Sequence, residues 1–313
     1  MARRHNDRKR RGRVVNGWLI VDKPSGMTST TVVNRVKRLY DAAKAGHGGT
    51  LDPLATGLLP IAFGEATKTV PYVMDGLKTY RFTLRLGQRT ETDDAEGDVV
   101  EESDVRPSEE DIRAALPQFI GNIQQTPPIY SAIKVNGERA YDLARANKPV
   151  VLEPRPIYIE DFQLIGYTDS DHADFLVMSG KGAYMRSLAR DLAQVVGTEG
   201  HISALRRLKV GPFTENDAIS LDELDSIGQI VALEQRLLPV AAALDDIPAL
   251  RLTEIEASRL KNGQTVSLLR KVDLQRIADF IDGDTVLATG QDGPIALVRY
   301  MAGEVQPIRL LNL

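Results

Sequence analysis

The 313-residue chain contains no cysteine, one tryptophan and four histidines. Without cysteine, the chain can form neither disulfide bonds nor thiolate metal sites, and it has no thiolate nucleophile. No apolar run approaches the roughly 20 residues that span a bilayer. The N-terminus also lacks the apolar segment of a secretion signal. These absences predict a cytoplasmic protein that binds no membrane.

Signatures of several enzyme classes are absent as well. The chain has no G-x-S-x-G elbow, no Walker A lysine loop and no H-E-x-x-H helix. Its histidines lie in dissimilar contexts, whereas a metal site needs three or four converging ligands. The acidic run "TETDDAEGD", residues 90–98, lacks the ligand order of a calcium loop, so a solvated hairpin loop is predicted there. The sequence therefore predicts neither a cofactor nor a metal.

The net charge is distributed unevenly along the chain. The net charge is −4, yet residues 1–13 carry +6 and the remainder carries −10. This arm is predicted to be disordered, and it serves either to contact RNA phosphates without sequence preference or as a solubilising tail. Because the rest of the chain is acidic, any nucleic-acid site must be a local basic patch.

Apolar spacing predicts a mixed α and β chain. Residues 80–86 alternate as in a half-buried strand, and residues 30–43 have the spacing of an amphipathic helix. A strand, a glycine turn and a helix that ends at Gly197 are predicted over residues 173–197. Arg186 would lie in the first turn of that helix. A cation there opposes the helix dipole, which indicates a nearby anion.

Two segments differ from the rest of the chain in composition and in the pattern of their residues. Residues 124–156 are bounded by prolines and carry five cations with Tyr130 and Tyr141 between them. This combination suits RNA backbone and bases, and it equally suits a charged surface hairpin and helix. Residues 249–313 combine a short helix with small strands punctuated by glycines, which predicts a compact, mostly β second domain.

The stretch "AGHGGTLDPLATGLLP", residues 45–60, places His47 among three glycines and Asp52 before a proline. Asp52 and Pro53 have the pattern of a helix N-cap followed by proline at the first helical position. The glycines indicate instead that something large approaches the backbone closely. A carboxylate held there beside an arginine could act as nucleophile or base. Composition alone leaves both interpretations open.

That stretch resembles the catalytic motif of the TruB family of tRNA pseudouridine synthases. Four further segments resemble the family's other motifs in order: "NGWLIVDKPSGMTS", "KTYRFTLRLGQRTETDDAEG", "SGKGAYMRSLARDLA" and "HISALRRLKVGPF". The last sixty-odd residues resemble a PUA RNA-binding domain. The resemblance covers nearly the whole chain after about residue 14. It departs from the bacterial pattern at Gly48-Gly49-Thr50, where small residues replace other small residues.

The resemblance implies three catalytic residues. Asp52 matches the aspartate that attacks the target nucleoside while its N-glycosidic bond is cleaved. Tyr80 matches the tyrosine that stacks on the flipped uracil. Arg186 matches the arginine that pairs with the catalytic carboxylate, which would supply the anion expected beside that helix start.

Four substrate-binding residues are implied in the same way. His47 matches the histidine that takes up space near the extruded base in the RNA. Lys23, with Pro24 beside it, matches a pair that supports the active-site loop. Tyr184 and Leu205 match residues that line the uracil pocket.

The implied architecture is α+β. It is a pseudouridine synthase fold, with a mixed, largely antiparallel sheet flanked by helices, over residues 14–247. A thumb at about 124–156 and a PUA-like domain over 248–313 complete it. The implied activity is isomerisation of uridine 55 in the T-arm of tRNA, without a cofactor or an obligatory protein partner. The alternatives are a guide-RNA-dependent synthase that acts with partner proteins and a non-catalytic tRNA-folding chaperone.

Overall fold

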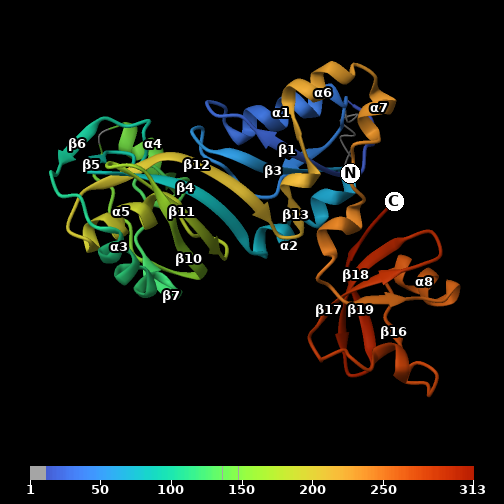
Figure 1. The fold of residues 1–313 in the computed structure, drawn as a ribbon. Coiled ribbons are helices and arrows are strands. Elements are labelled where there is room, and N and C mark those ends of the chain that lie inside the picture. The colour runs from blue at the N-terminus through green and yellow to red at the C-terminus, as the bar shows by residue number, and fades with distance from the viewer. Residues whose placement is uncertain (1–11, 136, 147) are drawn as a thin grey trace, which may run out of the picture.

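The computed structural model describes residues 12–135, 137–146 and 148–313 (Figure 1). Most of the predicted basic arm, residues 1–11, lies outside the described residues. At the start of the described chain, the Arg13 amide donates to the Asp41 carbonyl at 2.6 Å, and the Arg13 guanidinium lies 2.9 Å from Glu234. The end of the basic segment is therefore joined to the folded domain.

Ten strands form the main sheet, in the order β14-β1-β3-β12-β4-β11-β10-β7, with β2 paired to β3 and β13 to β12. Their bounds are β1 Gly17–Lys23, β2 Ala45–His47, β3 Thr56–Phe63, β4 Lys78–Leu86, β7 Gly121–Gln125, β10 Arg155–Asp169, β11 His172–Ser179, β12 Gly200–Val210, β13 Phe213–Thr214 and β14 Ala218–Ser220. The β1–β14 and β3–β12 pairs are parallel and the other pairs are antiparallel. The predicted mixed, largely antiparallel sheet is confirmed.

The main sheet consists of two halves that meet at β3 and β12. The ladder between these strands has two residue pairs, Arg206 with Thr56 and Arg207 with Gly57. By contrast, β1 pairs with β3 along its whole length, and β12 pairs with β4 along most of its length. The ladder at the junction is therefore much shorter than those on either side of it.

Each half of the sheet has its own helices and core. Helices α3 (Glu109–Ala115) and α5 (Met185–Val195) pack on the half that contains β4, β10 and β11. Its core includes Phe82 stacked on Phe175, with ring centroids 5.2 Å apart. Helices α1 (Ser29–Leu39) and α6 (Leu221–Ile227) cover the other half. The other elements of this domain are α2 (Val70–Asp75), α7 (Ile230–Glu234), β5 (Gln88–Thr90), β6 (Val99–Glu102) and the 3₁₀ turns at 64–68, 116–119, 215–217 and 240–244.

Helix α1 is shorter than the sequence predicted. It ends at Leu39, and the backbone leaves the right-handed helical region at Asp41, whose φ is +45°. Its N-cap is Thr28, whose hydroxyl accepts a hydrogen bond from the Thr31 amide at 3.1 Å. Ser29 and Thr30, which could also cap a helix, are not the N-cap. Ser29 is instead buried in contact with another segment, as described below.

The segment between β7 and β10 forms a small hairpin and a helix. These are β8 (Lys134–Val135), β9 (Glu138–Arg139) and α4 (Ala140–Arg145). The guanidinium carbons of Arg139 and Arg145 each lie 5.7 Å from the centre of the Tyr141 ring. The hairpin-and-helix form predicted for this segment is confirmed.

The C-terminal part of the chain forms a separate five-stranded sheet (red in Figure 1). Its order is β15 (Ala249–Arg251), β17 (Thr285–Thr289), β18 (Pro294–Met301), β19 (Glu304–Leu310) and β16 (Val266–Ser267). Helix α8 (Glu254–Lys261) and the 3₁₀ turn at 274–277 complete it. Leu287, Leu297 and Leu311 share a core with Trp18 and Val240 of the main domain. The predicted β-rich second domain is present and is packed against the first.

No helix in the described part of the chain is both long enough and apolar enough to cross a membrane.

Candidate active site

Asp52 lies in a turn and not at the start of a helix. The Ala55 amide donates to the Asp52 carbonyl at 3.2 Å, and β3 begins at Thr56. The helix N-cap interpretation of Asp52 is therefore wrong. The apolar run from residue 58 to 63 is buried throughout, and a short run buried on both faces is typical of a central strand.

Buried side chains fix the backbone on both sides of Asp52. The Ser29 hydroxyl accepts from the Leu51 amide at 2.8 Å and donates to the Leu51 carbonyl at 2.9 Å. The Lys23 ammonium, fully buried, donates to the carbonyls of Pro24 at 2.8 Å and Pro53 at 3.0 Å. Asp52 thus stands between two anchored residues, which holds its carboxylate in one position.

The predicted contact between Asp52 and Arg186 is present. Arg186 Nε lies 2.9 Å from Asp52 Oδ2 without hydrogen-bond geometry, so the attraction is ionic. Nη1 and Nη2 donate to the carbonyls of Thr92 at 2.9 Å and Tyr130 at 3.0 Å. The Asp52 side chain is 36% exposed and that of Arg186 is 6% exposed. A reactant can therefore reach the carboxylate, while its cationic partner is fixed below it.

The acidic run at 90–98 forms the predicted hairpin loop, since it joins the antiparallel strands β5 and β6, but only part of it is solvated. Asp93 and Asp94 are buried because helix α5 brings two arginines to them. Asp93 Oδ2 lies 2.8 Å from Arg190 Nη1, and Asp94 Oδ2 lies 3.6 Å from Arg186 Nε. Burial raises the pKa of Asp93, and Arg190 acts against this rise. Two arginines four residues apart at a helix start were the signal in the sequence, because both need anions on one face.

Tyr80 and Leu205 lie on the neighbouring strands β4 and β12, whereas His47 lies on β2, which pairs with β3. Leu205 in β12 is buried opposite Phe82 of β4, and Tyr80 of β4 packs against the same core. His47 ends β2, and its Nδ1 is buried without a hydrogen-bond partner in the described chain. Burial lowers the pKa of His47, and Arg207 lowers it further. The imidazole is therefore uncharged at neutral pH.

Tyr184 is held where helix α5 begins. Its amide donates to Gln125 Oε1 at 2.8 Å, and Gln125 Nε2 donates to its carbonyl at 3.1 Å. Burial raises the pKa of the Tyr184 phenol, and the negative charge of Asp52 raises it further. Tyr184 also lines a pocket of about 150 Å³ together with Pro127 and Ile133 of the insertion. Tyr184 thus lies between the insertion and the Asp52 carboxylate.

Two of the three glycines around His47 are explained by the protein's own packing and backbone conformation. A Cβ at Gly48 would lie 2.9 Å from Val73 Cγ1, and Gly49 has φ of +126°, which disfavours any side chain. Gly46 has open space around it. The close approach expected at these glycines is therefore made, at Gly48, by the protein itself.

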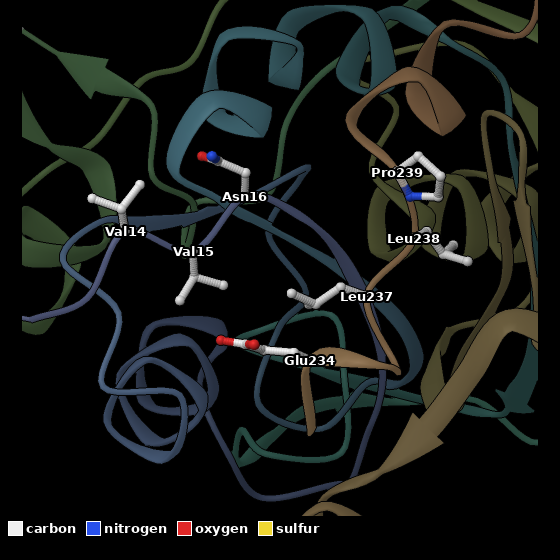
Figure 2. Close-up of a pocket in the computed structure, with 7 residues that line it drawn as sticks. All are labelled: Val14, Val15, Asn16, Glu234, Leu237, Leu238 and Pro239. Atoms are coloured by element: carbon white, nitrogen blue, oxygen red, sulfur yellow. The ribbon is translucent and has the colours of Figure 1, made fainter. Parts of the chain in front are cut away.

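A larger pocket, of about 360 Å³, lies elsewhere in the molecule (Figure 2). It is lined by Val14, Val15, Asn16, Glu234, Leu237, Leu238 and Pro239. None of the seven predicted site residues borders it. The larger hollow is therefore not the site that the sequence singled out.

Comparison with known proteins identifies the family. Residues 37–185 match the model for the TruB family pseudouridylate synthase N-terminal domain, and residues 186–245 match the tRNA pseudouridylate synthase B C-terminal domain. Proteins named tRNA pseudouridine synthase B are 61% identical in Gluconacetobacter diazotrophicus and 55% in Rhodospirillum rubrum. They cover 97% and 98% of this chain, and the chain covers 100% and 99% of them. The chain belongs to the TruB family.

The fold agrees with this assignment. The structure titled as a Cbf5-Nop10-Gar1 complex matches with a TM-score of 0.72 and 25% identity, covering 95% of this chain and 85% of that one. A structure of an H/ACA RNP bound to a substrate RNA matches with a TM-score of 0.72 and 22% identity, covering 96% and 86%. This TruB-family chain therefore has the pseudouridine synthase fold, and it is an isomerase.

Buried Lys23 predicts a pH dependence of stability. Burial lowers its pKa from 10.5 to about 8, while Glu96 and Asp52 act to raise it. Between these two values the unfolded chain binds more protons at this residue than the folded chain. The contribution of Lys23 to the free energy of unfolding therefore rises with pH in this window.

We expect urea unfolding to show this rise as a difference between the wild type and Lys23→Met. From about pH 8 to about pH 10.5, the wild type should gain stability relative to the variant. Lys78, whose pKa burial also lowers to about 8, is present in both proteins and cancels. A difference that is constant with pH would contradict the buried, charged Lys23.

Proposed function

We propose that this TruB-family chain isomerises uridine to pseudouridine at position 55 in the T-arm of tRNA. The observation that carries the proposal is the partly exposed Asp52 carboxylate, 2.9 Å from the buried Arg186 guanidinium. The 61% and 55% identical relatives are named tRNA pseudouridine synthase B, which supports tRNA as the substrate.

The reaction breaks the bond from uracil N1 to ribose C1′, turns the base and joins C5 to C1′. The proton at C5 leaves and N1 gains one, so no redox change, metal or nucleotide is consumed. Asp52 would attack the target nucleoside as the anion. Arg186 would keep that anion in place, because its other two nitrogens are already bonded to carbonyls of the surrounding loops.

The target base is stacked in folded RNA, so it would have to be flipped out, at a cost of about a few kcal/mol. Stacking on Tyr80 and occupation of the vacated space by the uncharged His47 would offset that cost. Tyr184 and Leu205 would line the uracil pocket. The fixed backbone on both sides of Asp52 means that the site would need little reorganisation when the base arrives.

The rest of the RNA would be held by two other parts of the chain. The insertion between β7 and β10 carries Arg139 and Arg145 beside Tyr141, and it would act as a thumb that closes on the T-arm. The C-terminal sheet would act as a PUA-like RNA-binding domain. Recognition would depend on the folded shape of the T-arm, with cations on phosphates and few contacts to base edges.

The test uses the purified chain and an unmodified tRNA transcript labelled with tritium at uracil C5. We expect one equivalent of tritium to be released per tRNA and a single pseudouridine to map to position 55. A transcript with cytidine at that position is the control and should release no tritium. Release from the control at the same rate would place the modified uridine elsewhere and refute the assignment.

The same assay separates the two alternatives. A guide-RNA-dependent enzyme would need added RNA and proteins, whereas we expect activity on the bare transcript. A non-catalytic folding chaperone would release no tritium but would accelerate tRNA refolding. The 61% and 55% identical relatives are named as synthases, which favours catalysis.

A further inference from the structure

The catalytic groups lie on opposite sides of the narrow junction in the main sheet. Asp52 lies in the loop that leads into β3, in one half. Tyr80 on β4 and Arg186 on α5 belong to the other half. The β3–β12 ladder that joins the halves has two residue pairs. A ladder this short gives little backbone restraint, so the relative position of the groups depends on side-chain contacts. Leu51 and Ala55 pack in the same core as Tyr80, Asp52 faces Arg186, and further side chains cross the junction itself.

Arg207 of β12 is one of the two residues at that junction, and its side chain crosses it. It is 2% exposed, and its Nε donates to the Leu58 carbonyl of β3 at 2.8 Å. Nη2 and Nη1 donate to the carbonyls of Gly49 at 3.0 Å and Thr50 at 3.3 Å, in the loop just before Asp52. One guanidinium therefore ties three backbone positions of one half to a strand of the other.

The backbone of Arg207 also contacts the second catalytic group. In β12, Arg207 pairs with Tyr80 of β4 on one side and with Gly57 of β3 on the other. Gly57 has φ of +94°, and a Cβ there would lie 2.2 Å from the Arg207 carbonyl oxygen. Glycine at position 57 leaves room for the Arg207 backbone, because any side chain there would clash with it.

Burying a guanidinium costs free energy unless ion pairs or hydrogen bonds compensate for its lost hydration. The contacts that Arg207 makes therefore indicate why an arginine is buried here. No carboxylate in the described chain forms an ion pair with Arg207 at 4.0 Å or less, so it is not there to complete a salt bridge. All its hydrogen bonds go to backbone carbonyls, two of them within three residues of Asp52. The planar fork of arginine can reach three such acceptors at once, which lysine cannot.

We propose that Arg207 is a positioning residue that sets the distance and orientation between the Asp52 carboxylate and the Tyr80 ring. It touches neither the substrate nor the reacting atoms. It holds the loop before Asp52 with its side chain, and it holds β4 at Tyr80 with its backbone. This inference rests on Asp52 and Tyr80 being the reacting pair, as proposed above.

Arg206 provides a matched control, because it lies beside Arg207 at the same junction. Its side chain forms a two-bonded ion pair with Asp22 of β1, at 2.9 Å and 3.0 Å. It also crosses from one half of the sheet to the other, yet it contacts neither the Asp52 loop nor Tyr80. Its side chain is 35% exposed. The same substitution at both positions therefore separates positioning of the site from general bracing of the junction.

The experiment measures tritium release in single turnover, with enzyme in saturating excess over labelled tRNA. At saturation the rate constant does not depend on the folded fraction, so a variant that is merely less stable keeps the wild-type value. For Arg207→Lys we expect the rate constant to fall by about 100-fold, because displacement by about 1 Å costs this much. The dissociation constant for tRNA should stay within about threefold. Arg206→Lys should keep both values within about threefold.

Three outcomes would overturn the proposal: a wild-type rate constant for Arg207→Lys, an equal loss in both variants, or a loss confined to tRNA affinity. If Arg207→Lys yields no folded protein, Arg207→Gln is measured in its place and must show the same separation of rate from affinity. If the wild type released no tritium, the proposed function itself would fail. That result is distinguishable from any difference between variants.

Discussion

Replacing Asp52 by asparagine is expected to lower pseudouridine formation by about 10⁴-fold or more, because the amide is not the anionic nucleophile. The tRNA affinity should remain within about tenfold, since phosphate contacts dominate binding to RNA. The change is nearly isosteric, and the backbone around Asp52 is held by Ser29 and Lys23 independently of the carboxylate. Tritium release and filter binding measure the two quantities.

The control is Asp75→Asn, which removes an exposed carboxylate in an ion pair with Lys181 and should leave the rate unchanged. Retained turnover in Asp52→Asn would refute the role of Asp52. If turnover and tRNA affinity fell together, Asp52 would be a binding residue and not the nucleophile.

The second large effect is expected for Arg186→Lys, with a loss of about 10²–10³-fold in the single-turnover rate. Arg186 bonds to the carbonyls of Thr92 and Tyr130 while facing Asp52 at 2.9 Å. Lysine keeps the positive charge, but its three donors share one nitrogen, so they cannot span two carbonyls and a carboxylate that are spread around a guanidinium fork. The ion pair and the anchoring of the insertion would be lost together.

Arg190→Lys is the matched control, one turn further along α5. Arg190 pairs with Asp93 and donates to the Thr126 carbonyl at 3.0 Å, so it also anchors the insertion without contacting Asp52. We expect its rate to fall by less than about tenfold. Equal losses in the two variants would show that anchoring of the insertion, and not the contact with Asp52, accounts for the effect.

The elements that follow from local pattern were largely predictable from the sequence. The alternation over residues 80–86 lies within strand β4, and the glycine turn before α5 and the β-rich C-terminal sheet are present. Where the prediction was wrong, a contact distant in sequence decided the outcome. Asp52 and Pro53 have the local pattern of a helix start, but the next buried run pairs in the centre of a sheet.

The acidic run at 90–98 is a second case in which contacts distant in sequence decided the structure. In the sequence, the segment that contains Asp93 and Asp94 has the pattern of a solvated loop, because neither carboxylate forms an ion pair with a residue nearby in the chain. Their partners, Arg186 and Arg190, lie more than ninety residues away and reach them only when α5 packs beside the loop. Burial of a carboxylate is tolerable only with such a partner, and a sequence read locally does not show it.

The sequence by itself determined the family and the identity of the chemical groups, because motif spacing and residue type are properties of the linear chain. Only the tertiary structure decided which of these groups meet. It placed Asp52 against Arg186, buried Asp94 behind them and set Arg207 across the junction of the sheet. The reason is that ionic contacts and hydrogen bonds act over a few ångströms, and chain folding alone brings residues this distant in sequence within that range.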